Sequence, residues 1–131
     1  MQTSSNDIFA EREKSLQNAL NELESVVCRC EKMKGKFPPR SSQDSLLKNR
    51  LHAMYVAKTM LDIHLQGEHA CPFTREELER ALPPVDSIIH KCTTAQKKWE
   101  QGTRYYQQFQ KTIDTMQIVK ELICAALQAA K

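Results

Sequence analysis

Apolar residues recur at alternating spacings of three and four along most of this 131-residue chain. This spacing places side chains on one face of an α-helix, and such a face is stable only when it packs against another element. The first series consists of Leu16, Leu20, Leu23, Val27 and Cys30, and the second of Leu47, Leu51, Met54, Leu61 and Leu65. The pattern predicts an all-α fold, an antiparallel helical bundle of three to four long helices plus one short helix, in a single domain covering 1–131.

Glycine and proline divide the chain between these two series. Gly35 should end the first helix, and the prolines at 38 and 39 cannot continue it because they lack the backbone donor that a helix needs. We therefore expect a proline-containing loop near 35–42, with the second helix beginning at Ser41 or Ser42.

A second turn is expected near 66–74. Gly67 suits the end of a helix, and Pro72 cannot continue one. Thr74 followed by Glu77 is a capping box, in which each side chain accepts a hydrogen bond from the other residue's backbone N–H. The stretch therefore predicts a capped turn that leads into a third helix.

The chain after this turn allows two arrangements. The third helix should be short and end at the proline pair 83–84, because the second proline suits the first turn of a fourth helix. The apolar series then keeps its phase over 85–116, across Gly102, which favours one continuous helix from the second proline to near the end of the chain. In the alternative, Gly102 is a C-cap and Thr103 is the N-cap of a further helix.

Two histidines and a cysteine stand close together in the second turn. His64, His69 and Cys71 could supply three ligands of a zinc site. The fourth would have to come from Cys28 or Cys30, whose side chains point about 200° apart on a helix. Helix punctuation accounts for the same stretch, so we expect no metal and no cofactor.

Signals for catalysis are weak. Cys71 has histidines nearby that could act as a base, but nothing in the sequence indicates an oxyanion site. Histidine phosphotransfer is a distant alternative, because His64 and His90 each carry only a fragment of such a pattern. We therefore expect no catalytic residues and a protein that is not an enzyme.

Basic residues are unevenly placed, although the formal net charge of +3 is too small to indicate a nucleic-acid or membrane partner by itself. Seven of them surround the expected proline-containing loop: Arg29, Lys32, Lys34, Lys36, Arg40, Lys48 and Arg50. Together they could bind an anionic partner through salt-sensitive contacts. Binding of nucleic acid or of an anionic lipid through the segment 29–50 is therefore an alternative function.

The preferred function depends on apolar surface. The second helix carries an additional apolar flank, and a very long last helix would leave part of its apolar face uncovered. Trp99, Tyr106 and Phe109 share the buried series, whereas Tyr105 does not. The residues expected to contact a partner are Val56, Met60, Ile63 and Tyr105. We predict a non-catalytic protein–protein interaction module, an adaptor or assembly subunit, that binds another protein or a second copy of itself.

The expected compartment is the cytoplasm or the nucleus. No stretch of eighteen apolar residues is present, and the first residues lack the charged-then-apolar order of a signal peptide. The five cysteines are odd in number and lie mostly within helical patterns, which is typical of free thiols in a reducing compartment.

Overall fold

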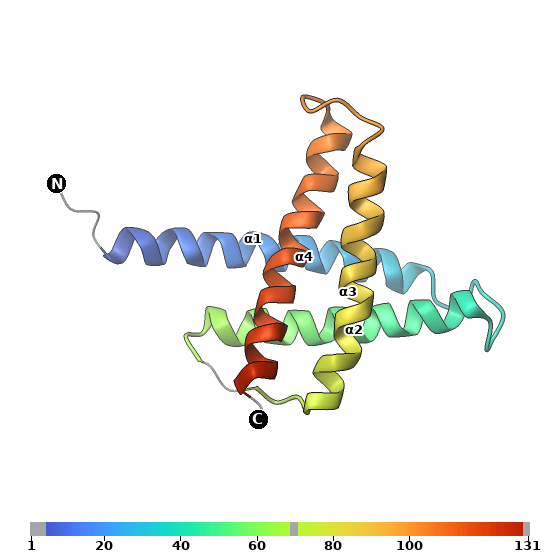
Figure 1. Ribbon diagram of the computed structural model, residues 1–131, viewed down its shortest axis with the longest axis horizontal. Coiled ribbons are helices and arrows are strands. Elements are labelled where there is room, and N and C mark those ends of the chain that lie inside the picture. Colours follow the sequence, from blue (N-terminus) through green and yellow to red (C-terminus); the bar gives the residue numbers. More distant parts are fainter. Residues whose placement is uncertain (1–4, 69–70, 130–131) are drawn as a thin grey trace.

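Four helices form two crossing hairpins in the computed structural model, which describes residues 5–68 and 71–129, with side chains from residue 11 onward. The helices are α1 (Ser5–Lys32), α2 (Ser42–Leu65), α3 (Arg75–Gln96) and α4 (Arg104–Ala129). Helices α1 and α2 are antiparallel in one layer, and the antiparallel pair α3 and α4 crosses them steeply in a second layer (Figure 1). Helix α2 contacts both α3 and α4, and α1 contacts α4. The predicted all-α antiparallel bundle is confirmed.

The core lies where the two hairpins cross. All four helices contribute side chains with less than 2% of their surface exposed: Leu23, Met54, Val56, Leu61, Leu78, Val85, Met116, Val119 and Ile123. Every member of the first two apolar series is buried or packs against this cluster. The three-four spacing therefore identified the buried face of α1 and one of the two buried flanks of α2.

The loops between helices use the residues that the sequence indicated. Gly35 and Gly67 both adopt positive φ angles, 79° and 76°, which glycine tolerates because it has no Cβ. Ser41 is the N-cap of α2, and its hydroxyl accepts a hydrogen bond from the Asp44 N–H at 3.2 Å. The proline-containing loop and the capped turn thus lie where the sequence predicts them.

The capping box at the start of α3 is complete. The Thr74 hydroxyl accepts from the Glu77 N–H at 3.2 Å, and the Glu77 carboxylate accepts from the Thr74 N–H at 2.9 Å. This hydrogen bond lowers the pKa of Glu77 below its ordinary value of 4.5. Because the folded-state pKa is the lower one, the stabilisation is present above pH 4.5 and is lost as the pH falls through the folded-state value.

Thr74→Ala should lower the free energy of unfolding by about 1 kcal/mol, because the Glu77 N–H loses its side-chain acceptor. The matched control is Thr94→Ala, at an exposed position within α3, which should change stability by less than about 0.5 kcal/mol. Urea unfolding followed by circular dichroism measures both variants. Equal losses in the two would contradict the role of Thr74 as a cap.

The prediction of a separate, short third helix was wrong, because α3 continues through Pro83 and Pro84. The two prolines leave the carbonyls of Glu79 and Arg80 without their helical donors. Both of these residues are exposed, so water can hydrogen-bond the two carbonyls. The apolar face is continuous on both sides of the prolines, since Leu78, Ala81, Val85 and Ile88 are all buried. Core packing therefore keeps one helix where local sequence favours a break.

The prediction of one continuous helix through Gly102 was also wrong, because α3 ends at Gln96 and α4 begins at Arg104. The loop 97–103 between the two helices is seven residues long. Seven residues would form about two turns of a helix, so the apolar series in the sequence has the same phase before and after the loop. Thr103 is the N-cap of α4, as in the alternative arrangement, and its hydroxyl accepts from the Tyr106 N–H at 3.3 Å. Gly102 lies in this loop without a positive φ, so it is not a left-handed C-cap.

Two side-chain contacts close the α3–α4 hairpin beside this loop. The buried Gln96 amide donates to the Tyr106 carbonyl at 3.2 Å and to the Gln110 side chain at 2.9 Å. Trp99 stacks on Tyr105 with ring centroids 4.4 Å apart. Trp99 was expected in the core, but 42% of its surface is exposed. The reversal of the chain at the loop places it at the end of the hairpin rather than inside it.

Candidate interaction groove

A groove with a volume of about 620 Å³ lies between the two hairpins. One side of the groove is formed by the parts of α3 and α4 nearest the loop that joins them. The other side is formed by the end of α1 and the beginning of α2, on either side of the proline-containing loop. Its apolar walls are formed by Val26, Cys30, Met33, Phe37, Leu46, Leu47, Ile88, Cys92, Tyr105 and Phe109. Each of the four helices therefore contributes to one concave apolar surface.

The groove gathers most of the apolar side chains that the fold leaves in water. Five large hydrophobic residues are exposed in the described part of the chain, and three of them, Met33, Leu46 and Tyr105, line the groove. Leu46 is the most exposed, at 62% of its surface. A fourth, Trp99, stacks directly on Tyr105. Clustering of exposed apolar surface in one concave place is typical of a binding site.

The side chains that line the groove and are charged at neutral pH are all cationic. They are Arg29 from α1, Arg50 from α2 and Lys91 from α3, and no Asp or Glu side chain of the described residues lines the groove. Three positive charges from three helices around an apolar surface favour a negatively charged or acidic occupant.

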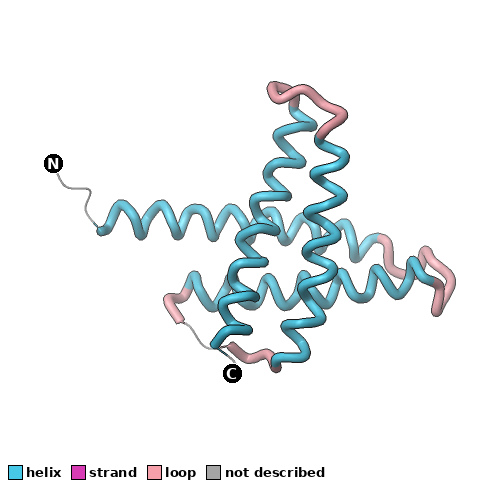
Figure 2. The backbone as a smooth tube through the Cα atoms, in the orientation of Figure 1, coloured by secondary structure: helices cyan, strands magenta, loops and turns pink. Residues whose placement is uncertain are grey.

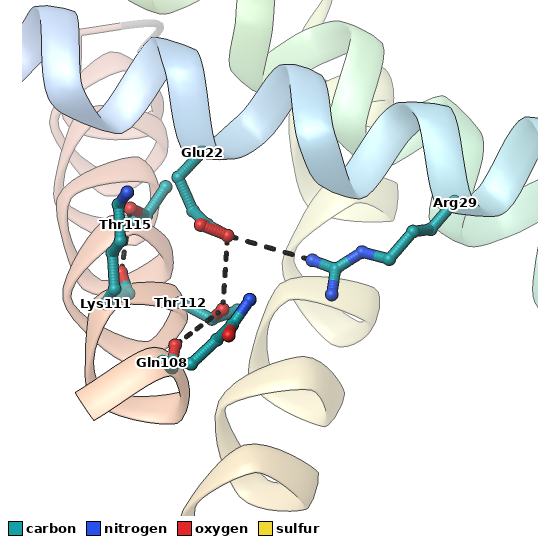
Figure 3. A network of polar contacts seen from close by, with 6 residues as sticks. All are labelled: Glu22, Arg29, Gln108, Lys111, Thr112 and Thr115. Atoms are coloured by element: carbon teal, nitrogen blue, oxygen red, sulfur yellow. Dashed lines mark hydrogen bonds and ion pairs between the residues drawn. The ribbon is translucent and has the colours of Figure 1, made fainter. Parts of the chain in front are cut away.

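Arg29 is anchored by a buried carboxylate at the side of the groove (Figure 3). Its guanidinium lies 3.7 Å from the carboxylate of Glu22, which is only 5% exposed, whereas the Arg29 side chain is 57% exposed. Glu22 also lies 3.5 Å from the hydroxyl of Thr112 on α4, and this hydroxyl lies 3.3 Å from the Gln108 carbonyl. Figure 3 shows Arg29 reaching to this carboxylate, which lies beside one terminal nitrogen of the guanidinium, while more than half of the Arg29 side chain stays exposed.

Two thiols form part of the apolar wall. Burial raises the pKa of both Cys30 and Cys92 above the ordinary value of 9.0, and the positive charges of Arg29 and Arg50 lower it only in part. Both thiols are therefore protonated at neutral pH. A protonated thiol that is buried, as in Cys30, or half-buried, as in Cys92, contributes apolar surface rather than a nucleophile.

The seven basic residues proposed from the sequence are divided between the groove and other parts of the surface. Arg29 and Arg50 line the groove, but the other five do not. Lys34 pairs with Glu31 at 3.1 Å, and Lys48 pairs with Asp44 at 3.0 Å. Lys32, Lys36 and Arg40 are exposed outside the groove. The groove therefore contains two of the seven residues, and binding of an anionic partner by the segment 29–50 stays a prediction.

The apolar strip proposed from the sequence is corrected at two positions. Val56 and Met60 are 1% and 2% exposed and belong to the core, so neither side chain can contact a partner. Helix α2 has two apolar flanks because it packs against α1 on one side and against the α3–α4 hairpin on the other. Ile63 is half-buried outside the groove, and Tyr105 lines it.

The residues considered for metal binding or catalysis are spread over the structure. Cys28 is exposed and Cys30 is buried, as expected for side chains on opposite sides of a helix. The His64 ring nitrogen Nδ1 lies 2.9 Å from the Met60 carbonyl, and His69 lies outside the described residues. Within 5–68 and 71–129, no three His, Cys, Asp or Glu side chains are grouped to hold a metal ion.

Sequence reasoning missed Lys91, Leu46 and Phe109 as members of a common site. Leu46 carried a weak signal, because it stands next to Leu47 and off the main apolar series of α2. Lys91 carried no such signal, since its place beside Arg29 and Arg50 depends on the crossing of the two hairpins.

No helix in the described part of the chain is long and apolar enough to span a bilayer. No protein-family model, no curated protein and no solved structure matches the chain.

Proposed function

We propose that this protein is a non-catalytic interaction module whose groove binds an acidic amphipathic helix of a partner protein. The observation that carries the proposal is the meeting of exposed apolar side chains with Arg50 and Lys91 in one concave surface, since these two cations take part in none of the ion pairs among the described residues. Met33, Leu46 and Tyr105 supply the apolar contacts, and Arg50 and Lys91 supply positive charge. A helix with an apolar face and acidic residues beside it complements both features.

The exposure of the groove walls favours a helix over an enclosed small molecule. Pockets for small ligands usually bury most of the ligand surface. Here Leu46 and Tyr105 remain 62% and 57% exposed, so an occupant of the groove would keep one side in water. An amphipathic helix meets this condition, because its polar face stays solvated while its apolar face is buried.

The free thiols support an intracellular setting for this role. The five cysteines carry no disulfide within the described residues, and two of them form the groove wall. Unpaired cysteines are typical of reducing compartments. We therefore place the interaction in the cytoplasm or the nucleus.

A synthetic helix tests the proposal. A fluorescently labelled peptide with leucines at i, i+4, i+7 and i+11 and glutamates beside them should bind the chain, as measured by anisotropy. The same peptide with lysine at every glutamate position is the matched control and should bind much more weakly. The charge reversals Arg50→Glu and Lys91→Glu together should weaken binding of the acidic peptide by about thirty-fold, at about 1 kcal/mol per reversed residue.

The control variant reverses two cations of the basic segment that lie outside the groove. Lys32→Glu with Lys34→Glu carries the same change in net charge and should leave peptide affinity within about twofold of wild type. Equal loss in both double variants would assign binding to general positive charge. Displacement of a hydrophobic dye by a free fatty acid, with no binding of either peptide, would assign the groove to a small amphiphile instead.

A further inference from the structure

We propose that the loop end of the α3–α4 hairpin is a contact site for an anionic lipid surface, next to the groove, with which it shares Tyr105. We call this region the apex and define it as residues 97–105. The proposal goes beyond the binding of a partner helix, because it involves a different kind of partner and the apex residues 97–104, none of which lines the groove. The apex contains the chain's single tryptophan, Trp99, and the exposed Tyr105.

The shape of the hairpin makes the apex accessible to a flat surface. The α3–α4 loop lies at the far end of the second hairpin, well clear of the layer formed by α1 and α2 (Figures 1 and 2). A convex tip can touch a bilayer while the remainder of the protein stays in water. Single-stranded nucleic acid is bound differently, because its backbone is normally tracked by a charged groove.

The side chains at the apex match the interface of an anionic bilayer. Trp99 and Tyr105 are 42% and 57% exposed and stack on each other, so they present one amphipathic aromatic surface. Tryptophan and tyrosine are enriched at the headgroup level of membranes, where one part of the ring is apolar and the other is hydrated.

Basic residues flank this aromatic pair. Lys97, Lys98 and Arg104 are exposed, and none of the ion pairs within the described residues involves them. Glu100 is the single acidic residue of the apex, so the region is net positive. Cations at this place would be attracted by anionic headgroups on the cytoplasmic leaflet.

Trp99 reports on the contact directly because it is the chain's only tryptophan. Vesicles of phosphatidylcholine with about 30% phosphatidylserine should shift its fluorescence to shorter wavelength and should co-sediment with the protein, whereas pure phosphatidylcholine vesicles should do neither. Lys97→Glu with Lys98→Glu should weaken binding at least about thirty-fold. Trp99→Ala should weaken co-sedimentation severalfold, since the inserted ring is lost.

Two controls separate the apex from net charge and from the groove. Arg12→Glu with Lys14→Glu makes the same change in net charge at exposed positions of α1 and should bind vesicles as wild type does. Leu46→Asp, a groove variant, should also bind vesicles normally. The proposal is overturned by equal losses in the two charge-reversed variants, or by the absence of vesicle binding by wild type. It is also overturned if a single-stranded oligonucleotide changes Trp99 fluorescence and anionic vesicles do not.

Discussion

Val56→Asp should unfold most of the chain, whereas the same substitution ten residues earlier, Leu46→Asp, should leave the fold intact. Val56 is 1% exposed at the crossing of the hairpins, and Leu46 is 62% exposed at the groove. A carboxylate at position 56 would lose its hydration and find no cation in the apolar core. We expect a loss of about 4 kcal/mol or more in the free energy of unfolding, which is most of the stability of many domains.

Leu46→Asp should change stability by less than about 0.5 kcal/mol, because the side chain already lies in water. Its place near the N-terminus of α2 also suits a negative charge, owing to the helix dipole. The variant should nevertheless lose affinity for the acidic peptide, because it removes an apolar contact and adds a repelling charge. Circular dichroism during urea unfolding and peptide anisotropy measure the two effects on the same samples.

This pair of variants decides between two descriptions of α2. If Val56→Asp kept the wild-type urea midpoint and lost only binding, Val56 would be a surface residue and the burial described above would be wrong. If Leu46→Asp unfolded the chain, the groove would be part of a tighter core. The expected pattern, one variant unfolded and the other folded but deficient in binding, follows only from a buried Val56 and an exposed Leu46.

Replacing Pro83 and Pro84 together by alanine should stabilise the protein by about 2 kcal/mol or more. Alanine at 83 would donate a backbone hydrogen bond to the Glu79 carbonyl, and alanine at 84 would donate one to the Arg80 carbonyl. Each substitution also removes a proline ring that clashes with the preceding turn of the helix. A proline in a helix interior costs about 3 kcal/mol, and the greater freedom of the unfolded alanine chain returns about 0.4–1 kcal/mol per site. The net gain is therefore large for a change outside the core.

The chain contains a matched control in a loop. Pro38 and Pro39 lie between α1 and α2, where no helical hydrogen bond is missing. Their replacement by alanine should destabilise by about 1–2 kcal/mol in total through the unfolded state alone. Urea midpoints of the two double variants should thus move in opposite directions. A loss of stability in the alanine pair at 83 and 84 would show that the chain breaks at the prolines.

Local features were predicted well because their physical causes are local. The caps at Ser41 and Thr74 need only a hydroxyl three residues before a backbone N–H, and the left-handed Gly35 and Gly67 need only the absence of a Cβ. The buried face of α1 and the first buried flank of α2 follow from periodicity alone. The same reasoning failed at Pro83 and Pro84, where packing of the neighbouring apolar residues outweighs a local preference for a break.

The site was predicted only in fragments, because it is assembled from four helices. Arg29, Arg50 and Tyr105 were named from the sequence, but nothing in the sequence joins them to Lys91 or separates them from Lys34. Only the crossing of the hairpins brings these cations around one apolar groove. The second flank of α2 shows the same limit, since an additional apolar face indicates another contact without saying whether a helix of the same chain or a partner makes it.

The sequence by itself thus determined the helical class, most helix boundaries, the buried face of the first helix and one of the two buried flanks of the second, since these depend on spacing and on short-range hydrogen bonds. The tertiary structure decided the turn at 97–103, the course of α3 through its prolines and the composition of the groove. A seven-residue loop preserves the apolar phase, so periodicity cannot distinguish a reversal of the chain from a continuous helix. That distinction depends on burial against α1 and α2, which are distant in sequence and close only in the folded protein.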